Sequence, residues 1–417
     1  MGVARSLAQH DLLQRFITTL AVGNGHQPGF LNYLPPHFSR KFTSQLNKRS
    51  VPAFLDVPIT TIELPEMLNL TARKLGLSET RRHRLWEWTE QNFDRRVASA
   101  WAGKAPVIYG CEHASVETFR RQKTLGGLNI LWQTIAHHSM MTTVLEEEQS
   151  AIENPTAYQR ELRRSLPRIN ARKDQQYADS DLIITNSHFA RQTFIDAGIS
   201  GAKVLAVPTG CPPVLDGAVQ EKRESPVIFL SAGMQSLRKG THYLIEAWKS
   251  LPKSINAELW LVGPMQLPET LLIDLPSSVV IKSAVPSEKL EEILKQSSVL
   301  VLPTLGEGLA HIILEALSAG LAIITTANSG CGELVEDDVN GWKVPVRDSA
   351  SIAERILWCV ENPRFLTEMQ LASQEKARRW QESQFVEEHG RVIEEFLKKK
   401  LSGTQASSTA TLNRLHP

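Results

Sequence analysis

Cysteine is scarce in this sequence and forms no cluster. The four cysteines among the 417 residues lie far apart, at Cys111, Cys211, Cys331 and Cys359. They make neither a CxxC pair nor the regular spacing of a secreted disulfide scaffold or a structural zinc site. A reducing compartment therefore fits the cysteine usage best.

Long apolar runs and an excess of one charge sign are also missing. No apolar run approaches the roughly 20 residues needed to span a bilayer, and Arg5, His10 and Asp11 interrupt any signal-peptide core. Lysine plus arginine number 46 against 45 acidic residues, so there is no broad basic surface for nucleic acid or an anionic membrane. We expect a cytoplasmic protein without nucleic-acid partners, in which local groups bind any anionic ligand.

Three common ligand-binding motifs are missing as well. The glycines of residues 23–29 lack the spacing of a dinucleotide-binding turn, and no GxxxxGK[ST] phosphate loop occurs. The DSD sequence at 179–181 looks like a metal-binding DxD motif, but it precedes the expected strand 182–185. Parallel sheets bind ligands beyond the carboxyl ends of their strands, which is the other end. We therefore interpret residues 179–181 as a turn between a helix and a strand, not as a metal site, and expect neither NAD nor ATP as a cofactor.

The chain does show short β-branched runs that alternate with amphipathic helical stretches. This alternation is typical of βαβ units and a parallel sheet, and 417 residues suffice for two domains. The expected strands are residues 16–19, 107–109, 129–135, 182–185, 204–207, 227–231, 259–262, 279–281, 299–302 and 321–325. The expected helices of the second half include 241–251, 287–296 and 309–319. We predict an α/β chain of two Rossmann-like, doubly wound domains that face a central cleft.

The expected domain limits follow composition along the chain. Two facing domains would each offer a binding site to the cleft between them, one for a donor and one for an acceptor. We predict an N-terminal acceptor-side domain at 1–212, a linker at 213–225 and a C-terminal donor domain at 226–384. A crossover helix at 385–401 and a disordered tail at 402–417 would follow. The chain opens in a helical stretch, whereas a Rossmann-like unit usually begins with a buried strand. The expected first strand is absent from the sequence pattern. A misplaced start site, a variant of the family and lost activity are three alternative explanations for this absence.

Residues 300–320 are the most informative stretch, because they predict a strand, a glycine-flanked turn and a helix. The free N–H groups at the helix start can bind phosphate oxygens, and Gly306 and Gly308 let the backbone approach closely. Glu307 and Glu315 would lie about 12 Å apart on a helix, so both can contact one nucleotide-sugar. Taken alone, either glutamate is more simply a structural residue of the helix.

A basic pair, Arg238 and Lys239, follows the first expected strand of the second half. Two neighbouring basic residues without further context usually lie in a solvated turn. Here the pair and the Glu307 turn both follow parallel strands, so both lie on the ligand-binding edge of one sheet. At that edge the two cations can neutralise a leaving diphosphate.

The order of these features resembles the donor domain of family 4 glycosyltransferases, which have the GT-B fold. The resemblance covers most of Pro226–Asn362 and rests on Gly233, Gly240, Val262-Gly263-Pro264, Glu307-Gly308 and Glu315-Ala316. It implies retaining, metal-independent transfer of a sugar from a nucleotide-diphosphate sugar, UDP- or GDP-linked, to an acceptor hydroxyl. The acceptor would be a glycan, a lipid-linked sugar or a small molecule.

The resemblance also implies roles for single residues. Lys239 and Arg238 would bind the diphosphate, Glu315 the ribose and Glu307 the sugar. The rest of the donor-binding set would be Gly233, Gly308, Leu309 and Ala310. Two positions depart from the family, which often has arginine at Met234 and glycine at Ala310.

Candidates in the N-terminal half are weaker. The expected strand 129–135 precedes His137 and His138, where family members often place a histidine near the sugar. We choose His137 as the second catalytic candidate, with an ordinary polar histidine as the equal alternative. Glu112 can line the acceptor side or be a surface carboxylate. Trp86 and neighbouring arginines can contact a lipid-linked acceptor at the inner membrane face, although a plain helix explains them more simply.

Two other functions stay open. One is a GT-B sugar-nucleotide epimerase, and the other is a catalytically weak scaffold that binds a nucleotide or a partner. The base, sugar, acceptor, linkage and oligomeric state are not encoded in any pattern of the sequence.

Overall fold

The structure is a computed structural model that describes residues 2–22, 56–150, 157–215, 217, 219 and 226–412. Its internal contacts divide the chain into a smaller unit, Met1–Phe93 with Glu382–Pro417, and a larger unit, Asp94–Gln381. The larger unit has a parallel sheet on each side of the predicted linker. The domain limits predicted from the sequence differ from the limits of these units and stay a prediction.

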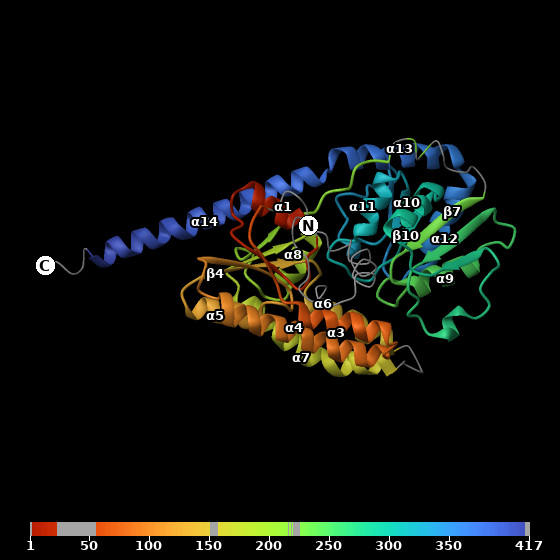
Figure 1. Cartoon of the computed structure of the whole chain (residues 1–417). Coiled ribbons are helices and arrows are strands. Elements are labelled where there is room, and N and C mark those ends of the chain that lie inside the picture. The colour runs from red at the N-terminus through yellow and green to blue at the C-terminus, as the bar shows by residue number, and fades with distance from the viewer. Residues whose placement is uncertain are drawn as a thin grey trace. The chain divides into compact units, whose positions relative to one another are not determined.

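The smaller unit pairs the start of the chain with its last helix. The parallel strands β1 (Phe16–Thr18) and β2 (Ile59–Thr61) accompany the helices α1 (Gly2–Gln9), α3 (Glu63–Lys74) and α14 (Glu382–Leu412). Ser6 Oγ donates a hydrogen bond to Val386 O at 2.6 Å, and His10 Nδ1 lies 2.8 Å from Glu394 Oε1. Figure 1 shows α1 in red beside the blue α14. Helix α14 therefore packs on the first helix of the chain. The range predicted for a crossover helix, 385–401, lies within α14, and its role as a crossover between domains stays a prediction.

Helix α14 also continues to Leu412, through most of the segment predicted to be a disordered tail. Residues 413–417 lie outside the described part. None of the helices in the described residues combines the length and hydrophobicity that a membrane span requires.

The first sheet of the larger unit has the strand order β3-β4-β5-β6, and all its strand pairs are parallel. Its strands are β3 (Val107–Cys111), β4 (Leu128–Gln133), β5 (Leu182–Thr185) and β6 (Val204–Ala206). The intervening helices are α5 (Val116–Thr124), α6 (His138–Ser150), α7 (Ala157–Asp179) and α8 (His188–Asp196), and α4 (Glu79–Trp101) precedes them. Phe119, Leu131, Ile183 and Phe194 are fully buried between helices and sheet.

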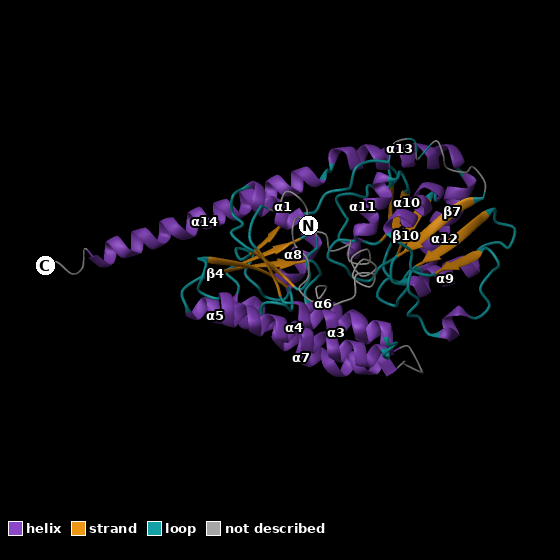
Figure 2. Ribbon diagram, in the orientation of Figure 1, coloured by secondary structure: helices purple, strands orange, loops and turns teal. Residues whose placement is uncertain are grey.

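The second sheet has the order β12-β11-β10-β7-β8-β9, again with parallel pairs. Its strands are β7 (Val227–Ala232), β8 (Ala257–Val262), β9 (Val279–Lys282), β10 (Val299–Leu302), β11 (Ala322–Thr325) and β12 (Gly341–Lys343). The helices of this part are α9 (Thr241–Ser250), α10 (Ser287–Gln296), α11 (His311–Ser318), α12 (Ser349–Glu361) and α13 (Pro363–Arg379) (Figure 2). The predicted α/β architecture is confirmed.

Both faces of the central strands β7, β10 and β11 are buried, which explains why these strands are almost continuously apolar. Successive residues of a strand point to opposite faces. Phe229 therefore belongs to one apolar core, whereas its neighbours Ile228 and Leu230 belong to the other. Burial on both faces is characteristic of parallel sheets covered by helices.

The order of the strands determines where a ligand can bind. The chain adds β8 and β9 on one side of β7 and then returns to add β10 on the other side. Such a reversal is the topological switch point of an open parallel sheet, and ligands bind beyond the carboxyl ends of the strands there. The segments after β7 and after β10 meet at this place.

A buried carboxylate links helix α6 to helix α9 and to the segment between β12 and α12. Glu148, with 5% of its surface exposed, accepts hydrogen bonds from His242 Nε2 at 2.8 Å, Tyr243 Oη at 3.1 Å and Arg347 Nε at 2.7 Å. Burial alone would raise the pKa of this carboxyl, but the bonds from His242 and Arg347 outweigh burial and lower the pKa below its ordinary value. We call these four residues the Glu148 clasp.

Replacing Glu148 with glutamine should weaken the fold. We expect the free energy of unfolding at pH 7 to fall by about 2–3 kcal/mol, because Arg347 and His242 lose a buried anion. Because the folded pKa is lowered, this stabilisation is present above the unfolded pKa and is lost as the pH falls through the folded pKa. The difference between wild type and variant should therefore shrink on acidification below about pH 4 in urea unfolding.

The neighbouring Glu147 offers a matched control. It pairs with the same Arg347 at 2.5 Å, but its side chain is 53% exposed. An exposed pair contributes little, so Glu147→Gln should change stability by less than about 1 kcal/mol. If the two substitutions lowered the free energy of unfolding equally, the buried bonds of Glu148 would stabilise the fold no more than an exposed ion pair does.

Candidate functional site

The loop after β7 and the turn after β10 are joined through their backbones. Leu305 N donates to Arg238 O at 2.8 Å, and Thr304 Oγ1 donates to the same oxygen at 3.1 Å. Gly240 has a φ of +69°, and a Cβ at this position would come within 1.9 Å of Pro303 O. Only glycine permits this approach, because it has no Cβ. The two segments predicted to bind the donor thus form one structure.

The predicted charged residues meet in a compact ion cluster. Glu307 Oε1 lies 2.5 Å from Arg238 Nη1 and 2.5 Å from Lys239 Nζ, and Arg238 Nη1 also donates to Gly306 O at 2.9 Å. The three charged side chains are at most 24% exposed. Burial lowers the pKa of Lys239, and the Glu307 carboxylate opposes this shift. The two cations are therefore concentrated at one point, with Glu307 as their counter-ion.

The turn before α11 has some of the free N–H groups predicted for it. The amides of Glu307 and Ala310 donate to Asn328 O and Ser329 O, both at 3.0 Å, and so are occupied. The amides of Gly308 and Leu309 have no acceptor among the described residues. Helix α11 begins at His311, two residues later than predicted. Free N–H groups of the kind that can bind an anion therefore occur in the turn as well as at the helix start, and anion binding by this segment stays a prediction.

Glu315 lies on α11, as predicted, and is half-buried. Burial raises the pKa of its carboxyl, and no described residue forms a hydrogen bond or ion pair with it. A carboxylate that is withdrawn from water without a partner is poised to accept hydrogen bonds from a ligand hydroxyl.

The other predicted donor-binding residues offer only backbone groups for a ligand, and their role stays a prediction. The side chains of Leu309 and Ala310 are 4% and 2% exposed and pack into the core beneath the turn. Gly233 has a φ of +113°, and the following Met234 is 43% exposed. The side chain of Met234 is therefore open to solvent.

Gly308 is enclosed by residues from the first sheet. A Cβ at this position would lie 2.1 Å from Thr134 O, and Ser187 Oγ donates to Gly308 O at 2.5 Å. Thr134 directly follows β4, and Ser187 lies two residues after β5. The carboxyl ends of both sheets therefore contribute to the surroundings of the turn.

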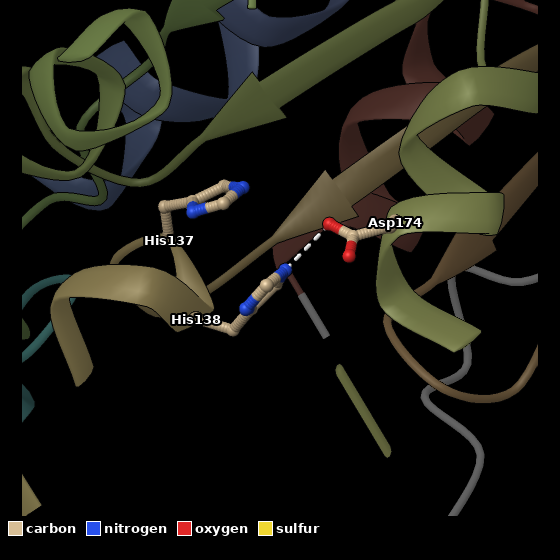
Figure 3. A group of neighbouring side chains, drawn as sticks. All are labelled: His137, His138 and Asp174. Carbon is tan, nitrogen blue, oxygen red and sulfur yellow. Dashed lines mark hydrogen bonds and ion pairs between the residues drawn. The ribbon is translucent and has the colours of Figure 1, made fainter. Parts of the chain in front are cut away.

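His137 lies after β4, as predicted, but its side chain is buried (Figure 3). Its ring packs against Phe194 and Tyr177 with centroid distances of 4.9 and 5.3 Å, and its Nδ1 lies 2.8 Å from Ser139 Oγ. Burial is the main cause that lowers its pKa to about 4. No contact within the described residues joins His137 to the Glu307 cluster, and its catalytic role stays a prediction.

Sequence reasoning missed part of a polar group around Glu112. Lys173 Nζ, Gln133 Nε2 and Tyr177 Oη lie 2.9, 2.9 and 3.2 Å from Glu112 Oε1. Burial would raise the pKa of Glu112, but Lys173 and the other partners lower it. Lys173 and Tyr177 come from α7, more than sixty residues later in the sequence. No local pattern connects them to Glu112.

Comparisons with known proteins agree with this geometry. Residues 216–380 match the family Glycosyl transferases group 1. The chain is 28% identical over 144 residues to the putative colanic acid biosynthesis glycosyltransferase WcaL of Escherichia coli K12, a match that covers 32% of this chain and 36% of that protein. The chain thus spans about a third of the length of that relative.

Solved structures match over most of the chain. Sucrose-phosphate synthase from Thermosynechococcus elongatus has a TM-score of 0.61 and 17% identity, with 95% of this chain and 92% of that chain covered. Anabaena HepE in complex with UDP-glucose has a TM-score of 0.56 and 14% identity, with 91% and 99% covered. The chain therefore has the GT-B fold of glycosyltransferases, and residues 216–380 are similar to group 1 of these enzymes.

Proposed function

We propose that this chain is a glycosyltransferase similar to family 4, which moves a sugar from a nucleotide-diphosphate sugar to an acceptor hydroxyl with retention and without a metal. The observation that carries the proposal is the meeting of Arg238, Lys239 and Glu307 at the switch point of the second sheet. The segment that is similar to group 1 glycosyltransferases contains all three residues.

Arg238 and Lys239 would bind the donor diphosphate. A diphosphate carries more negative charge than one carboxylate and offers more acceptor oxygens, so it can replace Glu307 at Nη1 and Nζ. Two fixed cations supply the positive charge that a divalent ion supplies in other phosphate sites. Glu307, once released, would be free to accept hydrogen bonds from sugar hydroxyls.

The reaction would break the bond between the sugar and the diphosphate while the acceptor hydroxyl attacks from the same face. The bonding electrons and the acceptor's proton would go to the departing phosphate oxygen. Arg238 and Lys239 would stabilise the charge that develops there, which is usually the largest catalytic contribution. For His137 we propose an orienting contact with the sugar, since a pKa of about 4 keeps its ring neutral at pH 7.

The donor and acceptor are proposed by similarity. HepE is described in complex with UDP-glucose, which favours a UDP-sugar, with a GDP-sugar as the alternative. The name of the Escherichia coli relative refers to colanic acid biosynthesis, which favours a glycan or lipid-linked acceptor. Action in the cytoplasm, with peripheral contact at the inner membrane face, completes the proposal. A sugar-nucleotide epimerase or an inactive scaffold is not favoured by the names of these relatives.

Nucleotide binding provides the direct test. In the presence of chelator, we expect one of UDP, GDP or ADP, or a sugar conjugate, to raise the apparent stability by about 2.7 kcal/mol at a ligand concentration of 100 times Kd. Glu315→Ala should remove most of this stabilisation, because the ribose hydroxyls would lose the carboxylate that accepts their hydrogen bonds. Thermal unfolding of both proteins with each nucleotide measures the effect.

Glu354→Ala is the matched control, because Glu354 is 71% exposed on α12 and should leave the nucleotide effect unchanged. Stabilisation that requires Mg²⁺ would contradict metal independence. Stabilisation that persists in Glu315→Ala would contradict the ribose role, and no stabilisation by any nucleotide would favour the scaffold. With an active donor, the anomeric configuration of the product by NMR tests retention.

A further inference from the structure

The hydroxyl of Ser187 joins the first sheet to the turn after β10. Ser187 lies two residues after β5, and its Oγ donates a hydrogen bond to Gly308 O at 2.5 Å. Ser187 is only 1% exposed, so water does not compete for this bond. We propose that Ser187 is a positioning residue for the donor. It orients the peptide between Gly308 and Leu309, so that the Leu309 N–H binds a phosphate oxygen of the nucleotide-diphosphate sugar.

A second hydrogen bond fixes the direction of the Ser187 hydroxyl. Ser187 is the N-cap of α8, and its Oγ accepts a hydrogen bond from Ala190 N at 3.0 Å. A hydroxyl oxygen that accepts from a helix amide still has its own proton to donate. That proton lies on the bond to Gly308 O. The start of α8 therefore holds the hydroxyl in place against the turn.

The Gly308 carbonyl has little freedom to turn away from Ser187. Gly330 has a φ of +75°, and a Cβ at this position would come within 1.8 Å of Gly308 O. The backbone of Gly330 therefore lies directly against the carbonyl oxygen, an approach that only glycine permits. The Ser187 hydroxyl and this backbone together confine the oxygen.

A fixed carbonyl also fixes the N–H of the same peptide. A peptide unit is planar and trans, so the Gly308 C=O and the Leu309 N–H point in opposite directions. The Leu309 amide has no acceptor among the residues that the structure describes, although Leu309 is only 4% exposed. A buried N–H without an acceptor is rare and calls for a partner. The Leu309 N–H is therefore aimed and unoccupied.

The place of Leu309 in the chain indicates which ligand it would bind. Leu309 lies two residues after Glu307, whose carboxylate pairs with Arg238 and Lys239. Phosphate oxygens attracted by these two cations are strong acceptors for a backbone N–H. This inference rests on the proposed function, because it adds a residue of the first sheet to the same donor site. Donor affinity would then depend on the contact between α8 and the turn.

The test compares binding of UDP with binding of uridine, which lacks the phosphates. Ser187→Ala should weaken UDP binding about fivefold or more, because the hydrogen bond from the Leu309 N–H to a charged oxygen loses its alignment. Uridine affinity should change by less than about twofold, because base and ribose do not depend on this peptide. Calorimetry measures UDP, and a ligand-observed NMR titration measures uridine, at a temperature where both proteins are folded. A general loosening of the site would weaken both ligands alike and would contradict the positioning role.

The comparison extends to other bases. If the parent protein binds GDP or ADP instead of UDP, that diphosphate and its nucleoside take the place of UDP and uridine.

Asp348→Ala is the matched control for the loss of a helix cap. Asp348 caps α12 as Ser187 caps α8, since its Oδ1 accepts a hydrogen bond from Ser351 N at 2.9 Å. The substitution should lower the melting temperature, because the cap is lost. It should leave the affinities for UDP and uridine as they are in the parent protein.

The Leu309 amide gives a readout in the unaltered protein. With isotopically labelled leucine, UDP should move the amide proton signal of Leu309 downfield and uridine should not, because a charged acceptor makes a stronger hydrogen bond. Leu309→Met assigns the signal by removing it. Equal UDP affinity in the parent and Ser187→Ala, or a Leu309 signal that UDP does not move, would overturn the inference and leave the proposed function standing. A parent protein that binds none of UDP, GDP and ADP would overturn both.

Discussion

Replacing Lys239 with methionine should lower kcat/KM for the donor about 10²–10³-fold, the usual effect of removing one preorganised group that stabilises transition-state charge. Methionine keeps the length and apolar stem of lysine but removes the cation. Arg238 and Glu307 would remain paired at 2.5 Å, so the fold should be largely preserved. The loss should therefore be seen in steady-state kinetics with the nucleotide-sugar and hardly in the melting temperature.

A surface lysine controls for the loss of a charge. Lys289 is 59% exposed on α10 and pairs only with Glu292 in the described residues. Lys289→Met should leave kcat/KM within about twofold of the parent, because exposed charges are screened by water and salt. Near-normal activity of Lys239→Met would mean that the diphosphate binds elsewhere. A large loss of stability in this variant would mean that Lys239 acts through the fold.

Replacing Gly308 with alanine should destabilise the protein by about 1–3 kcal/mol, the usual cost of forcing an extra methyl group into a packed site. The new Cβ would lie 2.1 Å from Thr134 O and 2.6 Å from Asn186 Oδ1. A backbone oxygen cannot rotate away as a long side chain can, so the turn or the segment after β4 must move. Urea unfolding measures the loss, and nucleotide-induced stabilisation should decline with it.

Gly332 provides the matched control for this substitution. A Cβ at Gly332 meets no atom within 4 Å, and its φ lies outside the left-handed region. Gly332→Ala should therefore change the free energy of unfolding by less than about 0.5 kcal/mol. If Gly308→Ala were as stable as Gly332→Ala, the close approach of the turn to Thr134 would not exist in solution.

Much of the second sheet could be predicted because its local signals are strong. Strand β10 and helix α10 have the predicted limits, since β-branched apolar runs and amphipathic periodicity are short-range properties. Strand β12 was not predicted, because three residues around Trp342 are too few to form a pattern. Helix α11 starts later than predicted because Ala310 has an extended backbone. Its amide bonds to Ser329 O instead of joining the helix.

The alternation of strands and helices can be predicted from local sequence, and so can the sheet edge at which Arg238, Lys239 and Glu307 lie. That inference needs only the rule that the carboxyl ends of parallel strands lie at the same edge of the sheet. The sequence does not show which side chains form ion pairs and hydrogen bonds at that edge. Several contacts join residues that lie between 36 and 199 positions apart in the sequence. They are the hydrogen bond between His138 and Asp174, the ion pair between Arg238 and Glu307, and the bond between Glu148 and Arg347. These contacts become visible only in the folded chain, because burial and hydrogen-bond partners depend on how distant segments pack and leave no periodic signal in the sequence.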